Sequence, residues 1–188
     1  SYHMGSGFTA SRATDPAFLA SMKAAAQTRN RAILSRVNPF LSPVELDYDR
    51  DVLPLTPNGN ATERHLCMAL EAAAARRFPD ESERAAFWAQ KLGGDAERIR
   101  AAMADSPTFQ GTIRSKTMKR GGVGYGRPEG PDFPRIDEVN AFILAQGAIP
   151  TFAWLDGTTP GEEAIDELFD LHIATGSAAV NIIPDRNW

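Results

Sequence analysis

Two short apolar segments near the C-terminus constrain the fold more than any other feature of this chain. Residues 148–154 and 178–183 are almost continuously apolar, which is typical of strands buried on both faces of a sheet. Between them, residues 162–175 place apolar side chains at helical spacing, with acidic residues on the opposite side. This order predicts a strand-helix-strand unit of the kind that builds parallel sheets and barrels.

Polar residues follow each of the two predicted strands, and ligand sites of such folds lie at the carboxyl ends of the strands. Asp185 is a candidate catalytic base or metal ligand and Arg186 a candidate substrate clamp, or the two form an ion pair that stabilises a loop. Asp156 follows the first strand in the same way, but it precedes Gly157 and is equally suited to a turn.

A single strand-helix-strand unit can neither close a barrel nor cover both faces of a sheet. We therefore interpret residues 135–188 as a fragment of a distorted β/α barrel, which belongs to a larger fold or borrows strands from a partner. Unpaired strand edges recruit other strands, so the exposed edges of this fragment also predict self-association into a homo-oligomer.

The preceding residues, 8–134, predict an α-helical region with a Pro-rich loop and a Gly-rich basic loop. Asp15-Pro16 opens a long helix that is expected to end at Asn38-Pro39, because a residue before proline avoids the helical conformation. Residues 39–60 predict a short helical turn followed by a loop.

Three further helix starts lie between residues 61 and 118, each at a residue that can cap a helix N-terminus. They are Asn60 or Thr62, Asp80 and Asp95. Residues 1–7 look like a cloning remnant or a flexible lead, which we expect to lie outside the fold. The fold class predicted for the whole chain is therefore α-rich α/β.

Composition excludes several classes of function. Acidic residues outnumber Lys and Arg 24 to 20, and the net charge of −4 argues against a general nucleic-acid binder. The single cysteine, Cys67, excludes an internal disulfide framework and indicates a reducing compartment, so we expect a cytoplasmic protein. No apolar segment approaches the ~20 residues that span a bilayer, and no signal peptide is visible.

The strongest local signal for chemistry is the basic, Gly-rich stretch of residues 111–130. It has a single acidic residue and five basic ones: Arg114, Lys116, Lys119, Arg120 and Arg127. Glycine lets backbone N–H groups approach an anion, and Lys119 and Arg120 would add charge and donors, so a phosphate or carboxylate site is one interpretation. The other is a mobile, solvated basic loop. The stretch lacks the P-loop pattern and no strand precedes it.

Arg64 and His65 lie near the N-terminus of a predicted helix, where anions bind favourably, and both are candidate substrate-binding residues. The structural alternative is that Glu63 pairs locally and that His65 packs or caps the helix. No HxH, CxxC or HExxH motif is present, so no metal site is complete within the chain. We expect His172, on the predicted C-terminal helix, to have a structural role.

Taken together, four segments give the chain a resemblance to the interior of a polymerase-and-histidinol-phosphatase (PHP) superfamily protein. They are LTPNGNATERHLCMAL, KRGGVGYGRP, RIDEVNAFILAQGAIPTFAWLDG and AAVNIIPDRNW, and they fall within residues 55–188. The resemblance implies a metal-dependent hydrolase on a seven-stranded, distorted β/α barrel, with residues 8–134 including its helical insertion. A divalent metal (Zn, Mn or Fe) and an anionic, phosphorylated substrate are then expected in the complete protein.

The chain departs from the superfamily pattern at the metal ligands. The opening HxH strand is absent, Trp154 stands where a metal-binding His is expected, and Asn181 stands near a usual Glu. The resemblance therefore implies that this chain alone binds no metal and is inactive. In the complete protein, the catalytic Asp185 and the substrate-binding residues would line the mouth of the barrel; the latter are Arg64, His65, Lys119, Arg120 and Arg186.

A hypothesis from a different class is a non-catalytic helical binding module, whose basic glycine loop contacts a protein or nucleic-acid partner. One geometric requirement applies to the anion site in either case. Arg64 and Lys119 can share a phosphate only if their charged groups lie within ~15 Å of each other, on simple side-chain reach.

Overall fold

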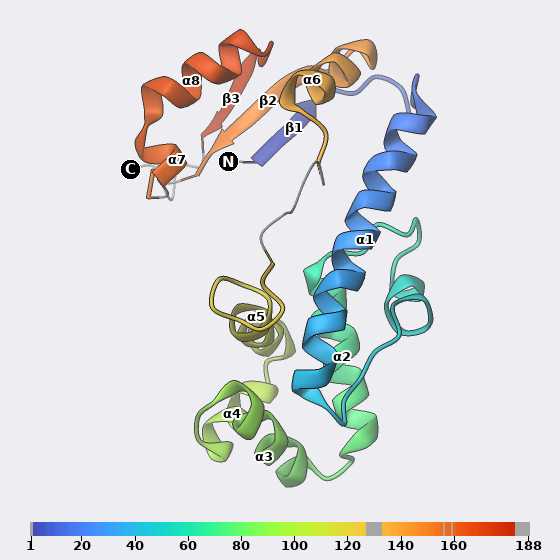
Figure 1. Ribbon diagram of the computed structural model, residues 1–188, viewed down its shortest axis with the longest axis vertical. Helices are drawn as coiled ribbons and strands as arrows, with labels where there is room; N and C mark the ends of the chain where they lie inside the picture. The colour runs from blue at the N-terminus through green and yellow to red at the C-terminus, as the bar shows by residue number, and fades with distance from the viewer. Residues whose placement is uncertain (1, 127–132, 156, 159, 183–188) are drawn as a thin grey trace. The chain divides into compact units, whose positions relative to one another are not determined.

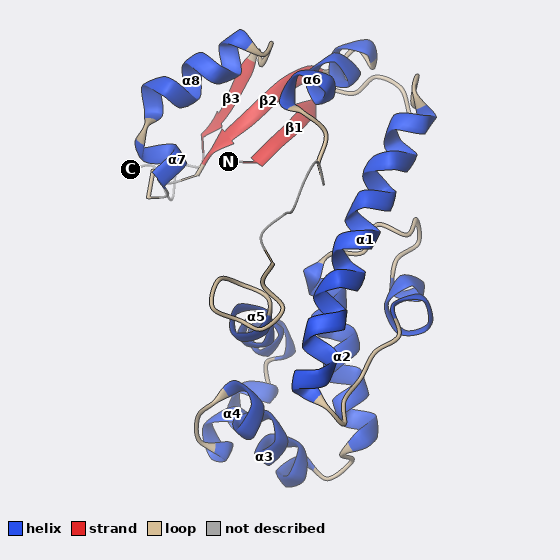
Figure 2. Cartoon of the chain, in the orientation of Figure 1, coloured by secondary structure: helices blue, strands red, loops and turns tan. Residues whose placement is uncertain are grey.

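A computed structural model of the chain describes residues 2–126, 133–155, 157–158 and 160–182. It consists of helices and one small sheet (Figures 1 and 2), which confirms the predicted α-rich α/β class. The chain divides into two units. The helical unit is Lys23–Asp132, and the sheet unit combines Ser1–Met22 with Phe133–Trp188. The second junction between the two units falls after residue 132, and residues 8–22 cluster with the C-terminal part.

The elements of the helical unit are one long helix followed by shorter ones. They are α1 (Pro16–Leu41, which begins in the sheet unit), the π-helix η1 (Tyr48–Val52), the 3₁₀-helix η2 (Leu53–Leu55), α2 (Glu63–Arg77), α3 (Glu81–Leu92), α4 (Ala96–Met103) and α5 (Ser106–Thr117). The sheet unit contains β1 (Tyr2–Ser6), α6 (Ile136–Ala145), β2 (Ile149–Trp154), α7 (Pro160–Glu163), α8 (Ile165–Ala174) and β3 (Ala179–Ile182).

Acidic caps begin the helices where the sequence predicted them. The Asp80 carboxylate accepts a hydrogen bond from the Glu83 N–H at 2.9 Å, and the Asp95 carboxylate accepts one from Glu97 at 2.9 Å. Thr62, rather than Asn60, is the N-cap of α2. The carboxylate oxygens of Asp80 and Asp95 satisfy N–H groups that have no partner within the helix, so the starts of α3 and α4 follow from local chemistry.

The prediction that α1 ends at Asn38-Pro39 is wrong, because the helix continues to Leu41. Proline removes one hydrogen bond from the last turn. Burial outweighs that loss, since Val37 and Leu41 are fully buried in the helical core. The Asn38 side chain also holds the next segment, donating to the Leu46 carbonyl and accepting from the Leu46 N–H. Tertiary contacts have here overridden a local stop signal.

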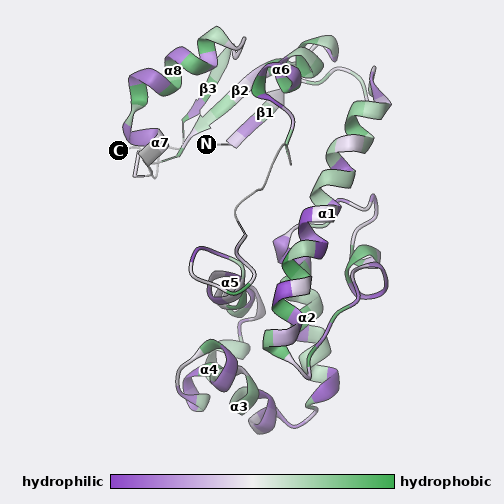
Figure 3. Ribbon diagram, viewed as in Figure 1, coloured by the Kyte–Doolittle hydropathy of each residue, from purple (hydrophilic) through white to green (hydrophobic). Residues whose placement is uncertain are grey.

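The core of the helical unit is built around large aromatic side chains from α3 and α5. Trp88 is fully buried, with its ring edge-on to Phe87 at 5.0 Å and to Phe109 at 5.6 Å between ring centroids. Figure 3 shows both polar and apolar residues on α2 and α3. Most of the buried residues of these two helices are apolar, and they lie on one face of each helix. On α2, four apolar residues at helical spacing are all buried: Leu66, Ala69, Leu70 and Ala73.

The sheet confirms the predicted strand-helix-strand unit. Strands β2 and β3 are parallel, with Phe152 opposite Val180, and α8 lies between them in sequence. Gly176, at φ 90°, follows α8 in the left-handed conformation that glycine adopts readily, as expected for a helix stop. The described sheet has three strands, in the order β1-β2-β3. It therefore supports a small mixed sheet and does not extend to a barrel.

The expectation that residues 1–7 lie outside the fold is wrong. Tyr2–Ser6 form β1, which pairs antiparallel with β2 and places His3 opposite Phe152. A buried strand has two edges whose N–H and C=O groups need partners, and β3 occupies only one of them. The N-terminal residues supply the second set of partners, so β2 becomes the central strand.

Helices α6 and α8 pack on the face of the sheet that carries Phe152. The Phe152 ring is stacked on the His172 ring at 3.9 Å between centroids, and the His3 ring is stacked with His172 at 5.7 Å. Asn140 of α6 joins this cluster through its side-chain hydrogen bonds to His3 and to the Thr175 carbonyl. His172 therefore has the structural role that the sequence predicted for it.

The prediction of two strands buried on both faces holds for β2 but not for β3. Four consecutive residues of β2, from Pro150 to Ala153, are buried, whereas Asn181 and Ile182 of β3 are exposed. In the part of the chain that the structure describes, β1 and β3 are edge strands with one unpaired side each. No helix in this described part is long and apolar enough to cross a membrane.

Candidate anion-binding site

The candidate site begins at the N-terminus of α2, where a buried carboxylate is fixed at the first helical position. Thr62 caps the helix, and its N–H donates to Nδ1 of His65 at 3.0 Å. This hydrogen bond stabilises the first turn of α2. The next residue after the cap, Glu63, points inward, and its side chain is 9% exposed. His65 therefore has the capping role that was the structural alternative to substrate binding.

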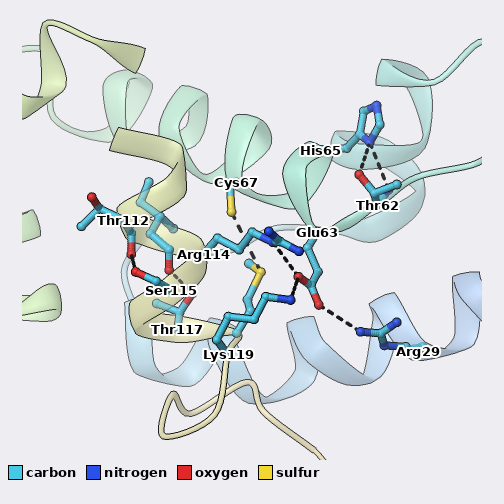
Figure 4. A network of polar contacts seen from close by, with 12 residues as sticks. Arg29, Thr62, Glu63, His65, Cys67, Thr112, Arg114, Ser115, Thr117 and Lys119 are labelled. Carbon is cyan, nitrogen blue, oxygen red and sulfur yellow. Dashed lines mark hydrogen bonds and ion pairs between the residues drawn. The ribbon is translucent and has the colours of Figure 1, made fainter. Parts of the chain in front are cut away.

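Three cations from two other parts of the helical unit converge on Glu63 (Figure 4). Arg29 of α1 contacts Oε1 at 3.0 Å. Arg114 of α5 and Lys119, which follows α5, contact Oε2 at 2.7 and 2.6 Å. The expectation that Glu63 pairs locally is wrong, because all three partners are more than thirty residues away in sequence.

The charge of Glu63 is maintained by these cations. Burial on its own raises the pKa of the carboxyl group, but the hydrogen bonds and positive charges of Lys119 and Arg114 outweigh it and lower the pKa below the ordinary 4.5. Glu63 is therefore ionised near neutral pH. Both carboxylate oxygens of Glu63 already contact cationic side chains. Glu63 therefore fixes the positions of Arg114 and Lys119 rather than serving as a proton acceptor.

The basic stretch of residues 111–130 is helical in its first part, which corrects its interpretation as a loop throughout. Helix α5 continues to Thr117, because Ile113 and Thr117 are buried one turn apart on its inner face. A tight turn follows, in which the Gly124 N–H donates to the Thr117 carbonyl at 2.6 Å. A Cβ on Gly122 would lie 2.6 Å from the Thr117 backbone, so this close approach requires glycine.

Two small pockets, each of about 80 Å³, flank this network within the helical unit. The first, which we call the Arg64 pocket, is lined by Arg64, Gln110, Gly111, Arg114, Ser115 and Lys119. The second, which we call the Tyr125 pocket, is lined by Arg29, Ile33, Arg36, Glu63, Met118, Lys119, Gly124, Tyr125 and Gly126. Lys119 lines both pockets, so the two are adjacent.

The pocket walls carry more positive than negative charge. Five of the lining residues are cationic and one is anionic: Arg29, Arg36, Arg64, Arg114 and Lys119 against Glu63. Arg64 is exposed, and within the described residues it forms no ion pair. A site with surplus cations and one uncommitted guanidinium group can bind an anion without breaking an existing ion pair.

The structure brings together two of the six predicted site residues, Arg64 and Lys119, on one pocket wall. His65 and Arg120 are not among the lining residues of that pocket, and Arg120 is exposed in the turn after α5. Asp185 and Arg186 lie outside the described residues. Their predicted catalytic and substrate-binding roles stay predictions.

Sequence reasoning missed the contribution of α1 to the site. Arg29 and Arg36 are seven residues apart and so lie on one face of the helix, which is a visible signal. Nothing in the sequence indicated that this face would meet Glu63 and Gly124, because those contacts depend on how three helices pack. Ser115 was missed for the same reason.

The described residues do not form the metal centre that the PHP resemblance implies. They contain no group of three or more His, Cys, Asp or Glu side chains that could hold a metal ion. Trp154, at the position of an expected His ligand, donates through its indole N–H to the Glu162 carbonyl at 3.4 Å. Burial raises the pKa of Cys67 to about 12, so this thiol is protonated near neutral pH.

Comparison with known proteins adds no assignment. No protein-family model matches the chain, and no curated protein or solved structure is significantly similar to it.

Proposed function

We propose that the helical unit binds the phosphate group of an anionic small molecule in the Arg64 pocket. The observation that carries this proposal is the arrangement of its cations. Arg114 and Lys119 are held by Glu63, while Arg64 lines the same pocket without an ion pair in the described structure. The positive charge is thus both fixed and incompletely neutralised, which is the condition for binding an anion rather than only stabilising the fold.

The chemistry of the lining residues suits phosphate. Arginine presents a planar fork of donors that matches two phosphate oxygens, and Lys119 adds a point charge. The Ser115 hydroxyl is a further donor and acceptor in the wall. Arg64 also lies in the first turn of α2, a 15-residue helix whose N-terminal N–H groups favour negative charge.

The size of the pocket sets how much of a ligand it can hold. Its volume of about 80 Å³ is well below the roughly 300–1,000 Å³ of sites that enclose drug-sized molecules. It therefore encloses one small group of a ligand, and the rest of the ligand would extend over the adjacent surface.

Within the PHP-like hydrolase hypothesis, the helical unit would be the substrate-binding part of a cytoplasmic, metal-dependent phosphoesterase. Arg64 and Lys119 would bind the substrate phosphate, and metal ligands from outside the described residues would supply the catalysis. The described residues form no metal-ligand group. In this proposal the helical unit binds the substrate, and Asp185 and Arg186 keep their proposed catalytic and substrate-binding roles.

The alternative is a non-catalytic module that contacts an acidic protein or a nucleic acid through the same cations. The local charge favours such a partner, because the helical unit has 17 Lys and Arg residues against 14 Asp and Glu. Hydrolysis of p-nitrophenyl phosphate in the presence of Zn²⁺, Mn²⁺ or Fe²⁺ separates the two ideas. If hydrolysis depends on the metal and the Arg64→Gln substitution reduces it, the hydrolase hypothesis is supported. If the chain binds the ligand without hydrolysing it, the binding-module hypothesis is supported.

Isothermal titration with ribose 5-phosphate tests the anion site itself. We expect saturable binding that Arg64→Gln weakens at least about tenfold, the equivalent of a hydrogen bond to a charged group. Arg98→Gln is the matched control, because Arg98 is an exposed arginine of α4 in the same unit and lines neither pocket. Equal affinities of wild type, Arg64→Gln and Arg98→Gln, or no binding to wild type, would overturn the proposal.

A further inference from the structure

The Tyr125 pocket has a composition that the anion site does not explain. It shares one lining residue, Lys119, with the Arg64 pocket, so the two pockets are neighbours. Two flat groups line it, the guanidinium of Arg36 and the ring of Tyr125, together with the apolar side chains of Ile33 and Met118. The other charged lining residues are Arg29, Glu63 and Lys119, and Glu63 pairs with both cations. The planar and apolar groups therefore suit a ring better than a second anion.

The Arg36 guanidinium is held in place by the glycine turn. Its Nε and Nη2 donate to the Gly124 carbonyl at 3.3 and 2.9 Å. A Cβ on Gly126 would lie 2.7 Å from Nη2 of Arg36, so a larger residue at 126 would displace the end of the Arg36 side chain. The orientation of the Arg36 guanidinium plane is thus fixed in the absence of a ligand. Its Nε and Nη2 donors are already hydrogen-bonded to the Gly124 carbonyl.

Tyr125 is available for contact. Its side chain is 45% exposed, and its two neighbours in sequence are glycines, which leave the ring uncovered. Within the described residues its ring makes no aromatic or cation–π contact. Aromatic rings and arginine planes are the two protein surfaces on which flat heterocycles stack.

We propose that the Tyr125 pocket receives a planar ring carried by the same ligand whose phosphate occupies the Arg64 pocket. The ligand class is then a phosphorylated molecule with a flat aromatic or heteroaromatic group, of which a nucleoside monophosphate is the simplest soluble probe. This inference rests on the proposed anion site and specifies what that site selects.

Titration of the full chain with inorganic phosphate, ribose 5-phosphate and AMP tests the proposal. AMP is expected to bind at least about fivefold more tightly than ribose 5-phosphate, which corresponds to the lower end of the stacking energy of one base. Tyr125→Ala removes this preference and leaves the affinity for ribose 5-phosphate within twofold of wild type. Tyr125→Phe retains the preference, because the ring remains.

Val123→Ala is the matched control, because Val123 is an exposed side chain of the same glycine turn that lines neither pocket. It should leave all three affinities unchanged. If wild type binds AMP and ribose 5-phosphate equally, or if Tyr125→Ala keeps the preference, the ring site is overturned while the anion site stands. If none of the three ligands binds, the anion site fails and the ring site falls with it.

Discussion

The two units of this chain differ in charge. The helical unit has 17 basic and 14 acidic residues, and the sheet unit has 3 and 10, so their formal charges are +3 and −7. The whole-chain charge of −4 conceals this difference. An argument against anionic partners from the total charge is therefore weak here, because the cations of the candidate site belong to a unit that is itself positive.

The units also differ in how completely they bury their large apolar side chains. The helical unit buries its largest side chains completely, including Trp88 and Phe109. The sheet unit exposes several large apolar residues of its helices and strands: Leu144, Ile149, Leu171, Ile173 and Ile182. Its described sheet also ends in two unpaired edges. This contrast indicates that the helical unit has the more complete core, and the predictions below test it.

The largest effect is expected from truncating the aromatic core of the helical unit. Trp88→Ala should lower the free energy of unfolding by about 3–5 kcal/mol, because it leaves a cavity among buried rings. Leu144→Ala in the sheet unit should change it by less than about 0.5 kcal/mol, since that side chain is 56% exposed. Urea unfolding followed by circular dichroism measures both. Similar losses from the two variants would contradict the contrast between the cores.

A smaller loss is expected when the buried carboxylate of the site is neutralised. Glu63→Gln leaves Arg29, Arg114 and Lys119 without their shared counter-charge. Because these three side chains are 33–49% exposed and can regain water, we expect about 1–2 kcal/mol rather than the larger cost of a fully buried pair. The control is Glu97→Gln, whose carboxylate is 74% exposed in its pair with Arg100. Equal unfolding midpoints for the two variants would show that Glu63 does not hold the site together.

The units should respond to acid in different pH ranges. Burial, and then the electrostatic interaction with His3, lowers the pKa of His172 below its ordinary 6.5. The unfolded chain then binds more protons than the folded one just below pH 6.5, so the sheet unit loses stability as the pH falls through that value. The pKa of Glu63 is also lowered, from 4.5, and its contribution is fully present above pH 4.5 and is lost at more acidic pH.

Methyl NMR signals of Ile143 in the sheet unit and Ile113 in the helical unit can follow this difference during urea unfolding. Between pH 7 and pH 5.5 the midpoint reported by Ile143 should decrease, and that of Ile113 should not. His172→Phe, which keeps a ring against Phe152 without a titrating group, should remove the decrease. If the midpoint still decreases in the His172→Phe variant, a titratable group other than His172 causes the pH dependence.

The smallest effect on stability is expected at the residue most important for the proposed function. Arg64→Gln should change the unfolding free energy by less than about 0.5 kcal/mol, because Arg64 is exposed and forms no ion pair in the described structure. A loss of several kcal/mol in thermal or urea unfolding would mean that Arg64 is a structural residue and would remove the main support for the anion site.

Local signals in the sequence account for much of the fold. The caps at Asp80 and Asp95 and the apolar runs that became β2 and β3 could be read directly from residue order. The features that could not be predicted depend on partners distant in sequence. Tyr2–Ser6 carries no strong strand pattern and becomes β1 because β2 has a free edge.

The same distinction applies to the site. Arg64 and Lys119 were visible as a helix-terminal cation and a cation of a glycine-rich stretch, and they do line one pocket. Glu63 was assigned a local partner, because no sequence rule indicates that Arg29 and Arg114, 34 and 51 residues away, would reach it. Long-range charge pairing requires the packing of α1, α2 and α5, which composition and periodicity do not determine.

The central claim is that the cations around Glu63 form a ligand site as well as a structural network. The most direct test is a phosphate titration of the uniformly ¹⁵N-labelled chain followed by amide NMR. The account predicts saturable shifts concentrated at Arg64, Ser115 and Lys119, with Arg98 of α4 unaffected. Shifts spread evenly over the exposed arginines and lysines of the helical unit, or no shifts at all, would contradict it.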